Sequence, residues 1–569
     1  MRKQLTIETA VKVAILLMIG ILSSYFHARF DLTADRRYSL SKPTKQMLSR
    51  LDDEILFRVY LDGDLPAGFQ RLQNSVREML DEFRAYGGEN IQYEFIDPAE
   101  NPNQQGRERV FRELYEKGLD PTNLQIKEKD GSTAQKLIFP GIIVSYAGRD
   151  VAVNILKNHV SASAEANLQT SIQSLEYDLT FAINQLLTPE APVIGFLRGH
   201  GELTPKLMED MVYTLGKFYT LRQVDATPEL VSTDSAGRLT YRALVVAQPL
   251  SRFSDAEKFM IDQYVMAGGR VLWLIDNTTA SLDSLQNSPE FFATPRSLYI
   301  NDLLFTYGVR INPNLIQDLS CLPIPQQVGM IGDQPQFKLM AFPYCLDIVN
   351  FGDHPIVRNI KEIKSEFAGS IDLVGKNADL KKTMLMCSSE RSKLVPTPSI
   401  VTLKVGVAQP NPQEFAFRNL PVAVLVEGEF ESAFKGILPV EFDTIKELDF
   451  RPKSTYTRQI FVSDGDIIRN PFDRKRNQPY PAGYDIYTRK MYDNTEFIVN
   501  CVNYLCADDD LLQLRSKNFR IGSLNKEKVR GRKTFLASIN IIIPLALIAL
   551  MGVVLILMRK IRFSKKINK

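Results

Sequence analysis

Glycines flank a histidine and a glutamate in GFLRGHGELTP, residues 195–205, between an apolar run and a helical pattern. Open α/β sheets bind ligands at the carboxyl ends of their strands, so Gly199, His200, Gly201 and Glu202 are candidate contacts for a ligand or a partner. The segment half-resembles a dinucleotide-binding loop, but the third glycine of GxGxxG is missing. A conformational turn with a capping polar cluster is the alternative interpretation.

A second candidate is the DGD tripeptide that follows a late apolar run and supplies Asp464 and Asp466. Two such carboxylates could bind a cation, although DGD after a strand is also typical of a turn. The five cysteines form no CxxC motif, so the sequence predicts no metal site and no cofactor. They are Cys321, Cys345, Cys387, Cys501 and Cys506, and the only pairing left open is Cys321 with Cys345.

The sequence offers no catalytic nucleophile where an amidotransferase-like sheet would expose one, on a glycine-flanked elbow between a strand and a helix. It also lacks a GxxxxGK[ST] loop for ATP. Subtracting nine basic and one acidic residues of the two ends turns 69 basic and 66 acidic residues into 60 and 65. This mildly acidic balance gives no electrostatic footprint for nucleic acid. We expect a protein that is not an enzyme, with a hydrolase site hidden at the His200 turn as an alternative.

The elements that position these residues fall into two units within an α/β fold class. Residues 53–188 show strand and helix patterns in the order β-α-β-α-β-β-α, with apolar residues at helical spacing from Phe69 to Phe83. This order resembles the thioredoxin fold. The segment 61–68, where that fold carries its cysteines, has none, so thiol chemistry is not expected.

Residues 189–520 form the second unit, in which near-continuous apolar runs alternate with helical patterns. Such runs are typical of a parallel sheet covered on both faces. A β-leaning insertion is predicted at 303–418. The expected strands are 193–197, 243–247, 271–275, 421–427 and 459–463, and the clearest helices are 255–267 and 496–505.

The two ends carry the apolar segments that are long enough to predict membrane crossing. Residues 535–558 hold no charged side chain over 24 positions, and about 20 apolar residues span a bilayer as a helix. Residues 11–28 are interpreted as an uncleaved signal anchor, with a cleaved signal peptide as the alternative. The other predicted segments are cytoplasmic tails at 1–10 and 559–569, a neck at 29–52 and a juxtamembrane linker at 521–534.

Basic residues beside both apolar segments predict two cytoplasmic termini and a periplasmic main domain in the bacterial inner membrane. Five further basic residues precede the last apolar segment, within 526–533. They leave a cytoplasmic main domain as the alternative orientation.

The order of several motifs along the chain carries a family resemblance. These are the neck DLTADRRYSLS, the strand-turn FLRGHGE, the segment FSDAEKFMIDQYVMAGGRVLWLID and the late FVSDGD. Together they resemble the GldG family, the gliding-motility-associated ABC transporter component of Bacteroidetes. The resemblance implies that the second unit is a GIFT domain, an amidotransferase-like fold that serves interaction. It also implies a membrane-anchored auxiliary subunit with a separate permease and a separate ATPase, and a periplasmic solute receptor is the alternative.

Overall fold

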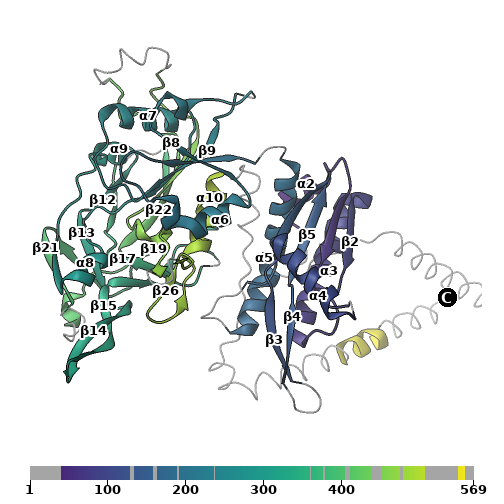
Figure 1. Ribbon diagram of the computed structural model, residues 1–569. Helices are drawn as coiled ribbons and strands as arrows, with labels where there is room; N and C mark the ends of the chain where they lie inside the picture. Colours follow the sequence, from purple (N-terminus) through teal and green to yellow (C-terminus); the bar gives the residue numbers. More distant parts are fainter. Residues whose placement is uncertain are drawn as a thin grey trace, which may run out of the picture. The chain divides into compact units, whose positions relative to one another are not determined.

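A computed structural model describes residues 40–506 with internal gaps, together with the helix 549–557 (Figure 1). Residues 38–517 form one compact unit, and 549–557 belongs to a second one. The internal gaps are 101, 128–132, 158–162, 189–190, 236, 359, 376–378, 404–410, 437–449 and 474–477.

The predicted fold class is wrong in giving the chain a transmembrane helix at each end. In the part of the chain that is described, no helix is both long and apolar enough to cross a membrane. Segment 11–28 lies outside the described residues, and of 535–558 only 549–557 is described. The predicted two-pass placement in the inner membrane, with its periplasmic main domain, is wrong by the same finding.

The first half of the compact unit contains a four-stranded sheet in the order β2-β1-β5-β6. Strands β1 and β2 are parallel, whereas β5 is antiparallel to β1 and β6 to β5. The strands are β1 (Ile55–Val59), β2 (Ile91–Phe95), β5 (Gly141–Tyr146) and β6 (Arg149–Asn154), and the helices are α2 (Lys42–Leu48), α3 (Ala67–Gly87), α4 (Gln104–Glu116) and α5 (Ala164–Leu187).

The periodic apolar residues of α3 and α5 are buried together in the core of this half. The helix predicted from Phe69 to Phe83 is confirmed as α3, and the closing helix of the predicted order corresponds to α5. The hairpin of β3 (Thr122–Lys127) and β4 (Thr133–Ile138) was not predicted. The thioredoxin-like assignment and the boundaries at 53 and 188 stay predictions.

An eight-stranded sheet in the order β16-β19-β22-β23-β10-β9-β7-β8 organises the second half. The five neighbouring strands β23, β10, β9, β7 and β8 are parallel. Strand β22 is antiparallel to β23, β19 is antiparallel to β22, and β16 is antiparallel to β19. The strands are β7 (Val193–Leu197), β8 (Thr220–Val224), β9 (Tyr241–Ala247), β10 (Val271–Leu274), β16 (Asn350–Phe351), β19 (Leu380–Cys387), β22 (Pro421–Gly428) and β23 (Thr457–Val462).

The prediction of a parallel sheet is therefore wrong for one side of this sheet. Strand β22 is buried along nearly its whole length, and a strand covered on both faces has a continuous apolar sequence in either direction. The predicted insertion 303–418 also supplies two strands of the main sheet, β16 and β19.

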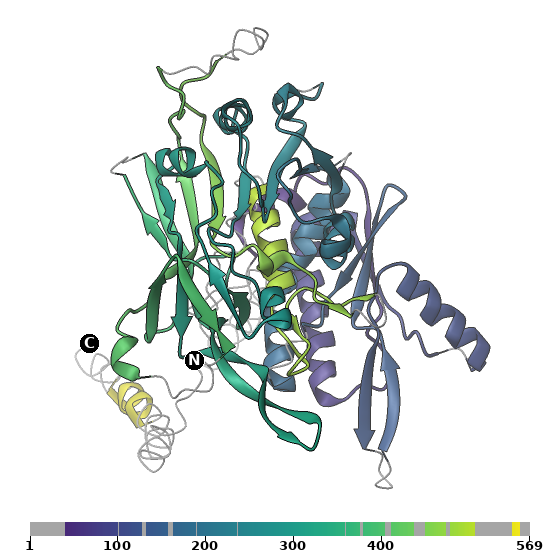
Figure 2. The same ribbon diagram turned by 60° about the vertical axis from the view of Figure 1, so that its left-hand side comes forward.

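Helices cover both faces of the main sheet (Figures 1 and 2). Along β9, Val245 contributes to the cluster with α6 and α10, and Val246 to the cluster with α7 and α9. These helices are α6 (Glu209–Gly216), α7 (Asp255–Met266), α9 (Asn301–Thr306) and α10 (Asn494–Cys506). The predicted helices at 255–267 and 496–505 are thus confirmed.

Smaller sheets pack around Phe342, Tyr344 and Phe367 beside the main sheet. Their main strands are β11 (Glu290–Ala293), β12 (Val309–Ile311), β13 (Asn314–Asp318), β14 (Cys321–Ile331), β15 (Gln334–Ile348), β17 (Ile363–Glu366), β18 (Ile371–Leu373), β20 (Ser392–Pro396) and β21 (Ser399–Thr402), and α8 (Leu282–Asn287) precedes β11. Four short strands follow β23: β24 (Phe472–Asp473), β25 (Gln478–Pro479), β26 (Tyr484–Asp485) and β27 (Lys490–Met491).

Candidate functional site

The chain changes direction across the main sheet between β7 and β9. Strand β8 lies on one side of β7 and the next strand, β9, on the other, which makes this a topological switch point. The loops that follow β7 and β9 meet there, because the backbone N–H groups of Leu250 and Ser251 both donate to the carbonyl of His200, at 2.8 and 2.9 Å. The His200 turn therefore lies at the edge where such sheets bind ligands.

The imidazole of His200 is 2% exposed and is held on three sides. Its Nδ1 lies 3.0 Å from Glu202 Oε1, and its Nε2 lies 3.3 Å from Glu257 Oε1. Its ring stacks on Phe253 with centroids 3.7 Å apart. Burial opposes the charged imidazole, but the two glutamates outweigh this effect and raise the pKa of His200. Glu202, Glu257 and Phe253, which contact this side chain, supply no nucleophile for a hydrolase.

Helix α7 fixes Glu257 in this arrangement. Ser254 caps the helix by accepting from the Glu257 N–H, and the Glu257 carboxylate accepts in return from the Ser254 N–H at 2.8 Å. This capping box satisfies N–H groups that the first turn leaves open. The pKa of Glu257 is lowered, because its bonds to Ser254 and its contact with His200 outweigh the effect of burial.

A cavity of about 280 Å³ opens on the other side of the turn, which we call the β7 cavity. Gly199, Gly201 and Glu202 line it, with Arg198 and Arg222 beside them. The guanidinium of Arg198 is already bound to Asp225, through contacts of 3.0 and 2.8 Å. Three of the four predicted residues thus border a cavity, whereas His200 is not among its lining residues.

The second predicted pair, Asp464 and Asp466, lies at the same edge of the sheet, after β23. The structure adds Asp276, which follows β10, and one oxygen from each of these carboxylates lies within 4.8 Å of the others. Gln248, which follows β9, donates to Asp276 at 2.6 Å and contacts Gly465. Sequence analysis missed Asp276, although it repeats the signal that found Asp464: an aspartate directly after an apolar strand.

Hydrogen bonds already satisfy much of this carboxylate cluster. Asp464 accepts from the Ser365 hydroxyl at 2.6 Å, from the Glu366 N–H at 2.8 Å and from the Asp466 N–H at 2.8 Å. Arg469 donates to Asp466 at 3.3 Å. Three carboxylates suit a hard divalent cation, but these donors compete for the same oxygens. We therefore interpret the cluster as part of the fold.

Burial raises the pKa of all three carboxyl groups, and repulsion by neighbouring carboxylates raises those of Asp464 and Asp466 further. The pKa of Asp466 rises to about 7, through burial first and then through Asp276 and Glu366, and Arg469 offsets part of this. Such neighbours release their protons as a group rather than singly. The cluster therefore holds protons near neutral pH.

Comparison with known proteins places most of this region in one family. A family model described as an ABC-type uncharacterized transport system matches residues 191–501, which is more than half of the chain. The chain belongs to this family. A second model, described as a domain of unknown function, matches residues 34–145.

Two further similarities accompany the family match. An uncharacterized protein of Borreliella burgdorferi is 21% identical over 419 residues, covering 72% of this chain and 74% of that protein. The solved structure of the mmIFT52 N-terminal domain is 13% identical and covers 56% of this chain and 98% of that structure. Its TM-score is 0.30, too low to assign the fold. The family match assigns the chain to the ABC-type transport family. The more specific resemblance to GldG is not tested by these comparisons.

Proposed function

We propose that this chain is a non-catalytic auxiliary subunit of an ABC-type transport complex, binding a permease subunit and through it an ATPase. The observation that carries the proposal is the family match over residues 191–501. The resemblance of the motifs to GldG supports gliding motility as the process that the complex serves.

The internal bonding of the candidate residues supports a non-enzymatic role. His200 is held between Glu202 and Glu257, and Asp464 is bound by three donors. A catalytic acid or base must reach a substrate proton, and the side chains of His200 and Asp464 are buried. The β7 cavity, bordered by Gly199, Gly201 and Glu202, remains open to a ligand or partner.

A long hairpin, whose backbone projects from the smaller sheets (Figure 2), offers a surface for the permease. Its strands, β14 and β15, expose Val328, Met330, Ile331, Phe337 and Leu339 by 51, 57, 66, 63 and 44%. Contiguous exposed apolar side chains of this kind mark interaction sites.

The pairing register places Met330, Phe337 and Leu339 on one face, because Met330 pairs with Pro335. Ile331 pairs with Gln334 and lies on the opposite face. Phe337 pairs with Gln327 and Leu339 with Pro325, whereas Lys338, on the opposite face, pairs with Gln326. Residues directly opposite each other in an antiparallel pair share a face. Pro325 also lacks the N–H that an added strand would need at this edge. A partner would therefore cover the apolar face rather than extend the sheet.

The charge of the hairpin favours a protein groove over a lipid surface. Residues 326–340 contain one acidic and one basic side chain, Asp333 and Lys338. Binding to anionic lipid gains strength from clustered basic residues, which this hairpin lacks. A neutral apolar groove on the permease matches it better.

The test is co-purification of the full chain with co-expressed permease and ATPase subunits encoded beside it. Phe337→Ser with Leu339→Ser is expected to weaken recovery of the permease at least about tenfold, because the apolar contact is lost. Phe292→Ser with Ile400→Ser is the matched control. These residues form an exposed cross-strand pair on β11 and β21, with exposures of 59 and 61%.

Equal recovery with both double variants would remove the hairpin from the interface. Failure of the unmodified chain to recover either subunit would contradict the proposed function itself. The same variants are added to vesicles of phosphatidylglycerol and phosphatidylethanolamine. Vesicle binding that only Phe337→Ser with Leu339→Ser abolishes would assign the hairpin to lipid instead.

A further inference from the structure

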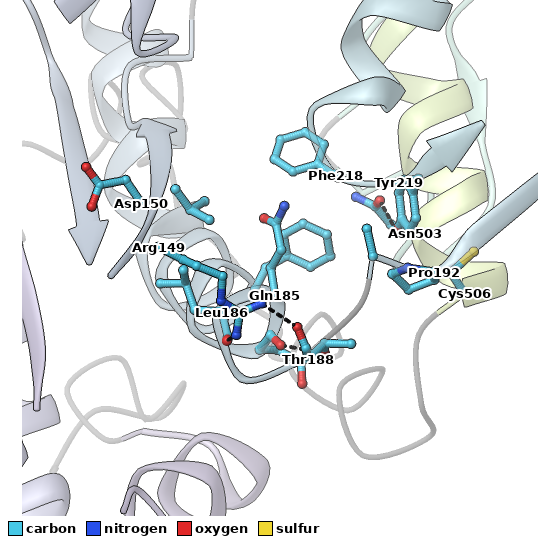
Figure 3. A pocket seen from close by; sticks show the side chains of 14 residues that line it. Arg149, Asp150, Gln185, Leu186, Thr188, Pro192, Phe218, Tyr219, Asn503 and Cys506 are labelled. Atoms are coloured by element: carbon cyan, nitrogen blue, oxygen red, sulfur yellow. Dashed lines mark hydrogen bonds between the residues drawn. The ribbon is translucent and has the colours of Figure 1, made fainter. Parts of the chain in front are cut away.

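A cavity of about 370 Å³ lies where the C-terminal end of α5 approaches α10, and we call it the α5 cavity (Figure 3). Phe181 and Phe218 pack edge to face on its border, with centroids 5.8 Å apart. Val151, Leu186 and Tyr219 extend the apolar lining. Its volume is within the range of small-molecule sites.

The charged groups at the cavity already hold hydrogen bonds within the protein. Arg149 donates to the carbonyl of Thr188 at 2.9 Å and to the carbonyl of Leu186, which closes the end of α5. Asp150 accepts from the Ser145 hydroxyl at 2.6 Å. A charged ligand is therefore disfavoured, because the protein group of opposite charge would first have to give up these hydrogen bonds.

One polar atom of the cavity is left without a partner. The Gln185 side chain donates from Nε2 to the carbonyl of Lys217 at 3.2 Å, but its Oε1 is buried and accepts no hydrogen bond. By contrast, Asn503 Oδ1 accepts from the Tyr219 hydroxyl at 2.8 Å. A buried acceptor gains most from a donor that a bound molecule brings with it.

We infer that the α5 cavity binds a small, uncharged, largely aromatic molecule that donates one N–H or O–H to Gln185. The aromatic pair and the aliphatic lining hold the body of the ligand, and the free Gln185 Oε1 orients it. This site is separate from the β7 cavity and goes beyond the proposed function, which does not depend on it.

The probe is N-phenyl-1-naphthylamine, an uncharged diaryl amine with one N–H whose fluorescence rises in apolar surroundings. The full chain should bind it at a single saturable site. Val151→Trp places a bulky side chain in the cavity and should abolish this binding. Val328→Trp is the matched control, since it makes the same exchange on the exposed hairpin and should leave binding unchanged.

A second variant tests the hydrogen bond without filling the cavity. The unmodified chain should bind the probe about five- to tenfold more tightly than its N-methyl analogue, which lacks the donor. Gln185→Leu should remove that preference while retaining the apolar contacts. This comparison also decides the case if Val151→Trp does not fold.

Three results would overturn the inference. One is the absence of saturable binding to the unmodified chain up to the solubility limit of the probe. Another is binding that persists in a folded Val151→Trp protein. The third is a preference for the N–H probe that Gln185→Leu leaves intact.

Discussion

Asp466 shares a buried cluster with Asp276 and Asp464, so its ionisation couples folding to pH. An unfolded aspartate releases its proton near pH 3.8, whereas the pKa of Asp466 in the folded chain is about 7. The folded state binds the proton more tightly, and stability therefore falls as pH rises from about 4 to about 7. Asp466→Asn removes this loss. Relative to the unmodified chain, its free energy of unfolding should improve by about 2 to 3 kcal/mol between pH 5 and pH 8.

Urea unfolding followed by circular dichroism at the two pH values measures this difference. Asp333→Asn, at an exposed carboxyl in the hairpin turn, is the control and should show almost none of it. Equal pH dependence of Asp466→Asn and the unmodified chain would show that the cluster does not hold its proton at Asp466.

His200 responds to pH through its two glutamate neighbours. Because Glu202 and Glu257 raise its pKa in the folded chain, protonation of His200 favours folding. That stability is fully present below the unfolded pKa of about 6.5 and is lost as pH rises through the higher folded value. Glu257→Gln removes one of the two charges and should lower the pKa of His200.

Histidine NMR titration measures the change, with the signal assigned by its loss in His200→Asn. Glu290→Gln, on the exposed side of β11, is the control and should leave the titration where it is. A midpoint that stays unchanged in Glu257→Gln would mean that Glu202 alone sets the charge of the imidazole.

At the scale of elements, the capping box of α7 connects helix stability to the His200 turn. Ser254→Ala removes the cap and the hydroxyl that donates to the Glu257 carboxylate at 2.6 Å, so it should cost about 1 to 2 kcal/mol. Ser254→Thr keeps the hydroxyl and should lie within about 0.5 kcal/mol of the unmodified chain. Thermal unfolding compares the two variants.

A second readout separates the two roles of the cap. Ser254→Ala should change the pKa of His200, because Glu257 loses the bond from the Ser254 hydroxyl and keeps only the one from the backbone N–H, whereas Ser163→Ala at the cap of α5 should not. If His200 titrates with the same midpoint in both serine-to-alanine variants, the Ser254 cap does not position Glu257.

Helices could be predicted from the sequence where the apolar periodicity was clear and the periodic segment was long. Helices α3, α5 and α7 follow from apolar residues three and four apart. The direction of β22 could not be predicted, because burial on both faces gives the same apolar run in parallel and antiparallel strands. The pairing that brings Asp276 beside Asp464 is likewise set by the parallel contact of β10 with β23, which no local pattern records.

At the scale of the whole molecule, the predicted membrane topology was the largest error. It rested on apolar composition at 11–28 and 535–558, whereas in the described part of the chain no helix is both long and apolar enough to cross a membrane. The family match over 191–501 does not depend on those ends. The transport-associated assignment therefore stands without the topology that accompanied it.

The five cysteines can report whether the main sheet and its neighbours unfold together. All five are free thiols, including Cys321 and Cys345, whose pairing the sequence left open. Burial raises the pKa of Cys321 and Cys387 to about 11, and that of Cys345 well above its usual range. At pH 8 these three hold almost no thiolate, the form that reacts with a disulfide reagent.

Reaction with 5,5′-dithiobis(2-nitrobenzoate) should therefore detect none of these three thiols in the folded chain and all five cysteines in guanidinium chloride. Ser49→Cys, at an exposed position after α2, should add one thiol that reacts at once. Cys345 on β15 and Cys387 on β19 lie in different sheets. Single-cysteine variants that retain one or the other should become reactive at the same rate in mild denaturant if both sheets belong to one cooperative unit. Two distinct rates would show that the β14–β15–β17 sheet opens independently of the main sheet.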